Sequence, residues 1–222
     1  MRAWMLALLL AVPGWAAADC RAALDRAARS VVLIEGQGVY GSGVVIGHNR
    51  VLTAAHVVAG LDHIWVRVAG ERRAASLVTR RPDDDLALLV APTGDLPALP
   101  LARAPLAPGE TVWAVGYPRG GPQRRGRGQF DYRRDGALYT SAPVDFGQSG
   151  GALLRCDGRR ATLAGIVRAF GAERVDGELR RLDDLSVATA GTRVRDFLRH
   201  GAPLARVLMR FLHPAESVAR AD

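Results

Sequence analysis

The sequence predicts an all-β protein of the barrel or sandwich type, divided into two similar halves. Its dominant pattern is short apolar or alternating runs separated by Gly, Asp or Pro, which is typical of antiparallel strands. A proline-rich stretch interrupts this pattern near the middle of the chain. With 49% hydrophobic and 23% charged residues, the composition excludes the disordered, collagen-like and membrane-bundle classes. A chain of 222 residues has room for one domain, or for two small lobes that share a core.

The N-terminal segment 1–18 has the layout of a cleavable signal peptide. Arg2 supplies a positive charge, residues 5–12 are apolar but too few to span a bilayer, and three alanines ending at Ala18 form a small-residue cleavage site. We therefore expect cleavage after Ala18, a mature chain that begins at Asp19, and a periplasmic or secreted protein. No other apolar run is long enough to cross a membrane, so we expect no transmembrane segment in the mature chain.

Export gives the two cysteines, Cys20 and Cys156, a specific meaning. In an oxidising compartment an even pair can form a disulfide, which here would tie the mature N-terminus to the C-terminal half. A loop of this length would give up to about 5 kcal/mol of stabilisation by chain entropy. Two unpaired thiols remain the alternative. A lipid anchor on Cys20 is disfavoured because the charged Asp19 precedes it.

The predicted strands lie on both sides of a connector at residues 92–110. Five of the twelve prolines fall within it, and their missing amide donors make it a poor strand. The first half, about 28–91, has predicted strands at 30–35, 41–47, 50–54, 63–68, 74–80 and 85–91. The second half, 111–190, has them at 111–116, 128–133, 137–143, 152–155, 162–169 and 186–190.

After residue 191 the apolar residues recur with a helical period. Val194, Phe197 and Leu198 form one stripe, and Pro203 starts a second one. The second stripe consists of Leu204, Val207, Leu208, Phe211 and Leu212. We expect one helix or a helix pair at 192–213, packed on the strands.

Residues suited to acyl transfer are concentrated in three segments, 53–57, 83–89 and 147–151. Nucleophilic acyl transfer needs a hydroxyl, a base, a carboxylate that orients the base, and donors for an oxyanion. His56 follows a strand, Asp85 ends an acidic triplet before an apolar run, and Ser149 is flanked by glycines. Any one of these three residues found alone would usually have a structural role. Their occurrence in one order, 29 and then 64 residues apart, indicates a Ser-His-Asp triad.

The motifs TAAHV, DLALL and GQSGGAL resemble those of the trypsin-like (chymotrypsin-fold) serine proteases, most nearly the bacterial high-temperature-requirement (HtrA/Deg-type) branch. The resemblance covers about residues 30–200 and includes VGYP at 115–118. It implies two six-stranded antiparallel β-barrels with the site between them, and an exported endopeptidase that forms an acyl-enzyme without cofactor or metal. It assigns His56 as general base, Asp85 as its orienting partner and Ser149 as nucleophile. The amides of Gly147 and Ser149 would form the oxyanion hole.

The choice of the acid, the residue before the serine and the PDZ-type module each limit what can be carried over from that family. Asp85 is chosen because the family's acid directly precedes the apolar strand, which leaves Asp83 and Asp84 as solvated turn residues. Gln148 stands where digestive trypsin-like enzymes carry an Asp that pairs with a new N-terminus, so activation by that salt bridge is not expected. The sequence leaves no room for a PDZ-type module, and we therefore do not carry over the branch's assembly behaviour.

Two other functions fit part of the pattern. The Gly-x-Ser-x-Gly match would suit an esterase, but the α/β-hydrolase order of Ser, acid and His fits poorly when so few residues follow Ser149. A trypsin-like binding module without turnover is the stronger alternative. A zinc enzyme is disfavoured, because the histidines and cysteines lack paired ligand spacing.

By the same resemblance, six residues are expected to line the primary specificity pocket. These are Pro143, Asp145, Phe146, Arg168, Phe170 and Ser186. No acid lies at the pocket floor unless Asp145 points inward, so a strict preference for Arg or Lys is not expected. Phe170 near the mouth favours a shallow pocket for small or medium apolar side chains.

The most basic segment is 119–134, which contains six of the chain's thirty arginines; lysine is absent. Such a patch could hold an acidic substrate, an anionic surface or nucleic acid by its field. Phe130 and Tyr132 are too few aromatics for a base-stacking platform. We interpret the segment as an exposed hairpin, and we expect proteins or peptides, not nucleic acid, as partners.

Overall fold

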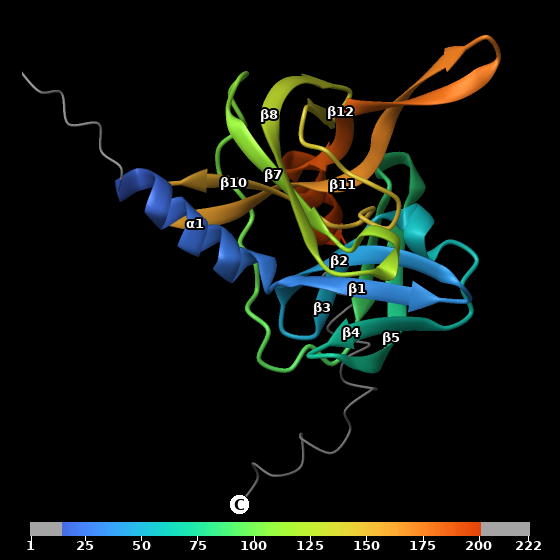
Figure 1. Ribbon diagram of the computed structural model, residues 1–222. Coiled ribbons are helices and arrows are strands. Elements are labelled where there is room, and N and C mark those ends of the chain that lie inside the picture. The colour runs from blue at the N-terminus through green and yellow to red at the C-terminus, as the bar shows by residue number, and fades with distance from the viewer. Residues whose placement is uncertain (1–14, 201–222) are drawn as a thin grey trace, which may run out of the picture.

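Two adjacent closed barrels, each of six antiparallel strands, make up most of the computed structural model, which describes residues 15–200 (Figure 1). The predicted fold class is confirmed. The first barrel has the strand order β1-β2-β3-β6-β5-β4 and the second β10-β11-β12-β9-β8-β7. The first contains β1 (Val31–Gly36), β2 (Val39–Gly47), β3 (Arg50–Thr53), β4 (Ile64–Val68), β5 (Glu71–Arg81) and β6 (Leu86–Val90). The second contains β7 (Thr111–Gly116), β8 (Arg124–Arg134), β9 (Ala137–Thr140), β10 (Ala152–Asp157), β11 (Arg160–Val175) and β12 (Glu178–Ala190).

Tight two-residue turns set the register of the main hairpins. Four of these turns have a residue and a following glycine that both adopt positive φ, as type I′ turns require to match the twist of the strands. The four pairs are Gln37-Gly38, Ala69-Gly70, Asp135-Gly136 and Asp176-Gly177. The last pair closes the β11–β12 hairpin, which projects from the body of the second barrel (Figure 1).

The sequence analysis missed the outer part of this hairpin. It ended one strand at residue 169 and began the next at 186, whereas β11 continues to Val175 and β12 begins at Glu178. Residues 172–178 are all exposed, so they carry no alternation of apolar and polar residues that would reveal a strand. The Asp-Gly pair was the signal that could have revealed the turn.

Strand β6 explains how the two barrels share a core. All five of its residues are buried, and alternate residues face opposite sides. Ala87 and Leu89 pack inside the first barrel. Leu86, Leu88 and Val90 belong to a cluster that also contains second-barrel residues such as Leu154. Asp85, the residue that precedes β6, is therefore held at the seam between the barrels.

Two helices cover this shared core. Leu24 and Ala27 of α1 (Trp15–Ala28) and Phe197 of the helix at 191–200 are buried in it. A disulfide joins Cys20 of α1 to Cys156 of β10. No helix within residues 15–200 is long and apolar enough to cross a membrane.

Some predicted features fall at or beyond the ends of the described chain. The expected cleavage point after Ala18 lies in the first turn of α1. The remainder of the predicted signal peptide, residues 1–14, and the second predicted helical stripe, which begins at Leu204, lie outside the described residues.

The connector at 92–110 contacts both barrels. The Leu99 amide donates to the Val45 carbonyl in the first barrel, at 2.8 Å, and the Ala102 amide donates to the Leu163 carbonyl in the second, at 2.9 Å. These two bonds, from residues only three positions apart, tie the middle of the connector to both barrels at the seam.

Candidate functional site

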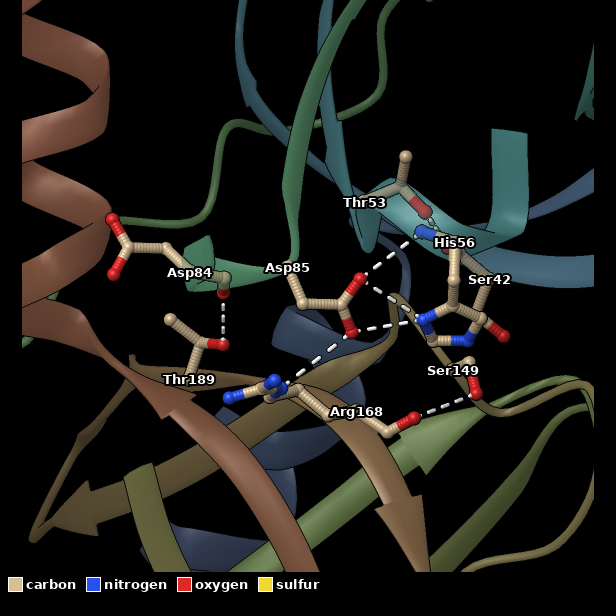
Figure 2. A network of polar contacts seen from close by, with 8 residues as sticks. All are labelled: Ser42, Thr53, His56, Asp84, Asp85, Ser149, Arg168 and Thr189. Carbon is tan, nitrogen blue, oxygen red and sulfur yellow. Dashed lines mark hydrogen bonds and ion pairs between the residues drawn. The ribbon is translucent and has the colours of Figure 1, made fainter. Parts of the chain in front are cut away.

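His56 lies directly after β3, in the short 3-10 helix η1 (Ala55–Val58). Its Nδ1 is 2.8 Å from Asp85 Oδ2 and 3.0 Å from Oδ1 (Figure 2). Because a carboxylate can only accept, Nδ1 carries the proton and Nε2 presents a free lone pair. The imidazole is half exposed, at 50%, so this lone pair faces outward from the barrel. The ring therefore has the tautomer and the exposure of a general base.

Asp85 is held in an uncommon backbone conformation. It follows the 3-10 helix η2 (Pro82–Asp84) with φ 51° and ψ 50°, in the left-handed region that Asp tolerates better than most residues. Besides the ring contacts, Oδ1 accepts a 3.0 Å hydrogen bond from the His56 amide. This third bond fixes the carboxylate relative to the η1 backbone, so the orientation of the imidazole is set by the fold.

The environment of Asp85 keeps its carboxyl charged. Burial alone would raise the pKa of the Asp85 carboxyl, but the hydrogen bond from the His56 ring, the His56 charge, the His56 amide and the Arg168 charge together lower that pKa below its usual value. At neutral pH the group is therefore a carboxylate, the form that accepts from Nδ1.

The three consecutive aspartates have different surroundings. Asp83 is exposed, as expected for a solvated turn residue. The same prediction for Asp84 is wrong: its side chain is 12% exposed and lies 3.0 Å from Arg81 and 3.7 Å from Arg193. Its carbonyl also accepts a 2.7 Å bond from Thr189 of β12. Asp84 therefore links the first barrel to the second barrel and to the helix at 191–200.

Ser149 lies in the loop between β9 and β10, where two glycines allow a close approach of the chain. A Cβ on Gly147, whose φ is 87°, would lie 2.6 Å from the Tyr117 carbonyl. A Cβ on Gly150, whose φ is 82°, would lie 2.1 Å from the Ser42 carbonyl. Only glycine fits these positions without moving backbone. The Ser149 hydroxyl donates to the Arg168 carbonyl at 3.0 Å (Figure 2).

A buried serine of the first barrel, Ser42, holds this loop. The Ser42 hydroxyl accepts from the Tyr117 amide at 2.9 Å and donates to the Gly147 carbonyl at 2.8 Å. The Ser42 amide donates to the Ser149 carbonyl at 2.8 Å. Among the described residues, none accepts a hydrogen bond from the Gly147 or Ser149 amides. These two donors are thus available to a ligand beside the hydroxyl. The sequence analysis did not single out Ser42, because nothing local marks it.

Arg168 is placed differently from its expected position in the specificity pocket. Its Nε lies 3.5 Å from Asp85 Oδ2, and its side chain is one-third exposed (Figure 2). The pocket prediction is therefore wrong for the Arg168 side chain, which β11 directs across the seam to the carboxylate. Its carbonyl remains beside Ser149.

The other expected pocket residues divide into two groups. Phe146 and Phe170 pack edge to face with ring centroids 4.9 Å apart, and Phe146 is 62% exposed, so these rings lie near the surface beside the serine loop. Pro143 is also exposed. Ser186, by contrast, is buried inside the second barrel, where its hydroxyl lies 2.8 Å from the Thr140 hydroxyl.

Asp145 is already paired with arginines. Arg181 from the β11–β12 hairpin lies 2.9 Å from its carboxylate, and Arg119 lies 3.5 Å away. Arg181 also donates to the Val144 carbonyl and lies over the Phe170 ring, 4.9 Å from its centroid. The Asp145 carboxylate is therefore not a free anion for a basic substrate side chain. The sequence analysis missed Arg181 because it missed the hairpin that carries it.

The basic segment 119–134 forms mainly β8, which lies between β7 and β9 in the closed second barrel and is linked to α1 by one ion pair. Arg125 pairs with Asp25 of α1 at 2.7 Å, while several other arginines of the strand are exposed. This arrangement resembles the expected hairpin more than a dedicated binding surface.

The alternatives from the sequence can be compared with the site. Ser149 is followed by strand β10, whereas the nucleophile elbow of an α/β-hydrolase is followed by a helix, so the esterase fold does not apply. In the part of the chain that the structure describes, no cluster of three or more His, Cys, Asp or Glu side chains could hold a metal ion.

Comparisons with known proteins show which proteins this chain is similar to. A family model described as a trypsin-like peptidase domain matches residues 41–166. The serine protease Rv3671c of Mycobacterium tuberculosis is 36% identical over 155 residues, which cover 62% of this chain and 37% of the relative. A probable periplasmic serine endoprotease, DegP-like, of Hahella chejuensis is 33% identical over 129 residues, covering 53% of this chain and 28% of the relative. The matches thus span well under half of these curated relatives.

Solved structures give the same result at greater coverage. The inactive form of the Rv3671c protease superposes with a TM-score of 0.69 at 26% identity, covering 81% of this chain and 92% of the other. A serine endoprotease from Yersinia pestis has a TM-score of 0.70 at 27% identity, covering 88% and 68%.

Proposed function

We propose, from the premise that this chain belongs to the trypsin-like peptidase domain family, that it is a serine endopeptidase whose triad is His56, Asp85 and Ser149. The observation that carries the proposal is the His56–Asp85 pair, in which Nε2 of His56 faces outward. Ser149 lies at the same seam, and the Gly147 and Ser149 amides beside its hydroxyl have no acceptor among the described residues. These groups supply the base, the orienting acid, the nucleophile and the oxyanion donors that acyl transfer needs.

The first half-reaction begins with a rotation of the Ser149 hydroxyl. In the resting site this hydroxyl donates to the Arg168 carbonyl, and turning about χ1 redirects it toward His56 Nε2. As Oγ bonds to the substrate carbonyl carbon, its proton passes to Nε2. Asp85 stabilises the imidazolium through Nδ1–H. The carbonyl electron pair moves onto oxygen, where the amides of Gly147 and Ser149 bind the negative charge.

Collapse of this tetrahedral intermediate completes the first half-reaction, and attack by water makes up the second. The imidazolium gives its proton to the leaving amine as the C–N bond breaks, which leaves an ester between the substrate acyl group and Ser149. Water then attacks that ester, His56 accepts its proton, and Oγ leaves with the proton returned. The chain's own residues carry every proton in this cycle.

We further propose that an apolar side chain occupies the position before the cleaved bond. The Phe146 and Phe170 rings supply an apolar surface beside Ser149, and Arg181 and Arg119 already neutralise the nearby Asp145. A basic substrate side chain would find no free carboxylate there. A peptide library cleaved by the purified protein and read by mass spectrometry would show apolar residues at that position; enrichment of Arg or Lys would contradict this assignment.

Export is part of the proposal. The Hahella relative is described as periplasmic, and a disulfide such as Cys20–Cys156 persists in oxidising compartments. Export with cleavage after Ala18 would leave both cysteines in the mature chain. N-terminal sequencing of the protein from the periplasmic fraction should begin at Asp19. Recovery of an uncleaved chain from the cytoplasm would contradict export.

Covalent labelling tests the activity without a known substrate. The protein and its Ser149→Ala variant are treated with a fluorophosphonate, and their intact masses and their cleavage of denatured casein are compared. We expect one added probe and casein cleavage for the wild type, and neither for the variant. A folded wild type that neither labels nor cleaves would favour the binding-module alternative.

A further inference from the structure

Arg168 contacts the candidate site at two points, one through its backbone and one through its side chain. Its carbonyl accepts from the Ser149 hydroxyl at 3.0 Å, and its guanidinium lies 3.5 Å from Asp85 Oδ2. Figure 2 shows the side chain reaching from the second barrel to the face of the carboxylate turned away from the His56 amide. The resemblance to the family placed this residue in the specificity pocket, whereas its side chain contacts Asp85.

The guanidinium and the imidazole share one carboxylate. Arginine keeps its charge at every accessible pH, so a positive charge stands permanently beside Asp85. When His56 takes up a proton, a second positive charge appears on the same carboxylate, and the two cations repel each other. The neutral imidazole, which alone can accept the serine proton, is therefore favoured by the presence of Arg168.

We propose that Arg168 is a positioning residue that acts through Asp85 and extends catalysis to lower pH by opposing the protonation of His56. The inference rests on the proposed function. Burial raises the pKa of the Asp85 carboxyl, but His56 and then Arg168 lower it below its usual value, which agrees with a carboxylate that serves two cations.

The other charged groups near Asp85 are directed elsewhere. From η1 and β11, His56 and Arg168 face its carboxylate. From β5 and the helix at 191–200, the arginines that approach bind the neighbouring Asp84 instead; they are Arg81 and Arg193. The Thr189 hydroxyl of β12 donates to the Asp84 carbonyl. Arg193 is consequently a matched control, since it has the same charge and lies in the same region but pairs with a different carboxylate.

The test measures the rate of fluorophosphonate labelling from pH 4 to 9 in the full protein and four variants, Arg168→Gln, Arg168→Met, Arg168→Lys and Arg193→Gln. The rate needs the neutral base, so its acid limb reports the availability of His56. We expect Arg168→Gln to move the midpoint of that limb upward by about 0.5–1 pH unit, because the one-third exposure of the guanidinium leaves its interaction with Asp85 partly screened. Arg168→Lys should stay near the wild type, and Arg193→Gln should match it.

Each result decides the matter. An unchanged midpoint in Arg168→Gln, with only a lower plateau, would overturn the inference and leave Arg168 a structural residue. An equal shift of the midpoint in Arg193→Gln would show that any nearby positive charge has this effect, and it would also overturn the inference. Loss of folding in Arg168→Gln and in Arg168→Met would do the same, because the guanidinium would then be needed for stability. A wild type that never labels at any pH would instead refute the proposed function itself.

Discussion

The two barrels hold their parts of the site in different ways. In the first barrel, His56 and Asp85 are joined by three hydrogen bonds between two neighbouring turns of the same barrel. In the second barrel, the loop that carries Ser149 depends on the first barrel, because Ser42 binds the carbonyls of both Gly147 and Ser149. The acid–base pair is thus local, whereas the serine loop is assembled across the seam.

This difference has a consequence for how the site can fail. A change within the acid–base pair should remove chemistry and leave the barrels intact. A change at the seam should affect stability and chemistry together, because the same contacts join the barrels and shape the serine loop.

Asp85→Asn should break the local pair with the fold preserved. Asn also tolerates the left-handed conformation at φ 51°, but its amide no longer selects the Nδ1–H tautomer of His56. We expect the labelling and cleavage rates to fall by about 10⁴-fold. The control is Asp83→Asn, an exposed carboxylate in the same turn, which should keep the wild-type rate. A drop of less than tenfold in Asp85→Asn would contradict the role of Asp85.

Gly150→Ala should disrupt the contact between the two barrels through a steric clash. The new Cβ would lie 2.1 Å from the Ser42 carbonyl at a backbone φ of 82°. We expect a loss of about 3 kcal/mol or more in the free energy of unfolding, measured by chemical denaturation, together with loss of labelling. Gly158→Ala has a similarly positive φ, 64°, but open space around the Cβ, and should cost only about 1 kcal/mol. Equal losses in the two variants would mean that backbone strain, not contact across the seam, is responsible.

Ser42→Ala removes the hydroxyl between the barrels without adding atoms. The Tyr117 amide and the Gly147 carbonyl would lose their partner in a fully buried position, which should cost about 1–3 kcal/mol in the free energy of unfolding. A less fixed Gly147 should also lower kcat about tenfold while changing KM little. Ser141→Ala, which removes a hydroxyl that accepts from Gln129 at an exposed edge, serves as control. If Ser42→Ala lost stability but kept its kcat, the Ser42 hydroxyl would not be needed to hold the serine loop in its catalytic geometry.

The smallest expected effect is on stability in acid. The pKa of the Asp85 carboxyl is lowered in the folded protein, so its contribution to stability is present above the ordinary value near 4 and is lost as the pH falls through the lowered folded value. Denaturation from pH 6 to pH 2.5 should show the wild type losing more stability below about pH 4 than Asp85→Asn. Parallel curves for the two proteins would indicate that the carboxyl is not perturbed.

The same division between local and distant contacts explains what the sequence could predict. His56, Asp85 and Ser149 lie in short motifs that could be recognised from their order and spacing, and the structure pairs His56 with Asp85. That Ser149 acts with this pair stays a prediction. The strand regions followed from alternation, although β11 and β12 continue past the predicted ends into an exposed hairpin. Alternation indicated only a barrel or a sandwich, and the resemblance to the family implied the two six-stranded barrels.

What the sequence could not show depends on partners far along the chain. Asp83 and Asp84 look alike in sequence, yet Asp84 pairs with Arg193, which lies on a helix more than a hundred residues later. Ser42 looks like any serine in a strand until the serine loop is placed against it. Arg168 was assigned to the pocket from its position on β11, and only the relative placement of the barrels directs its side chain to Asp85.

The central claim is that groups from the two barrels act as one unit, and one measurement tests it directly. Fluorophosphonate labelling is followed over time in the wild type and in His56→Ala, and the modified residue is identified by peptide mass spectrometry. If base and nucleophile work together across the seam, the wild type is modified at Ser149 and His56→Ala reacts more than about 10³-fold more slowly. Equal rates in the two proteins, or modification at a residue other than Ser149, would contradict it.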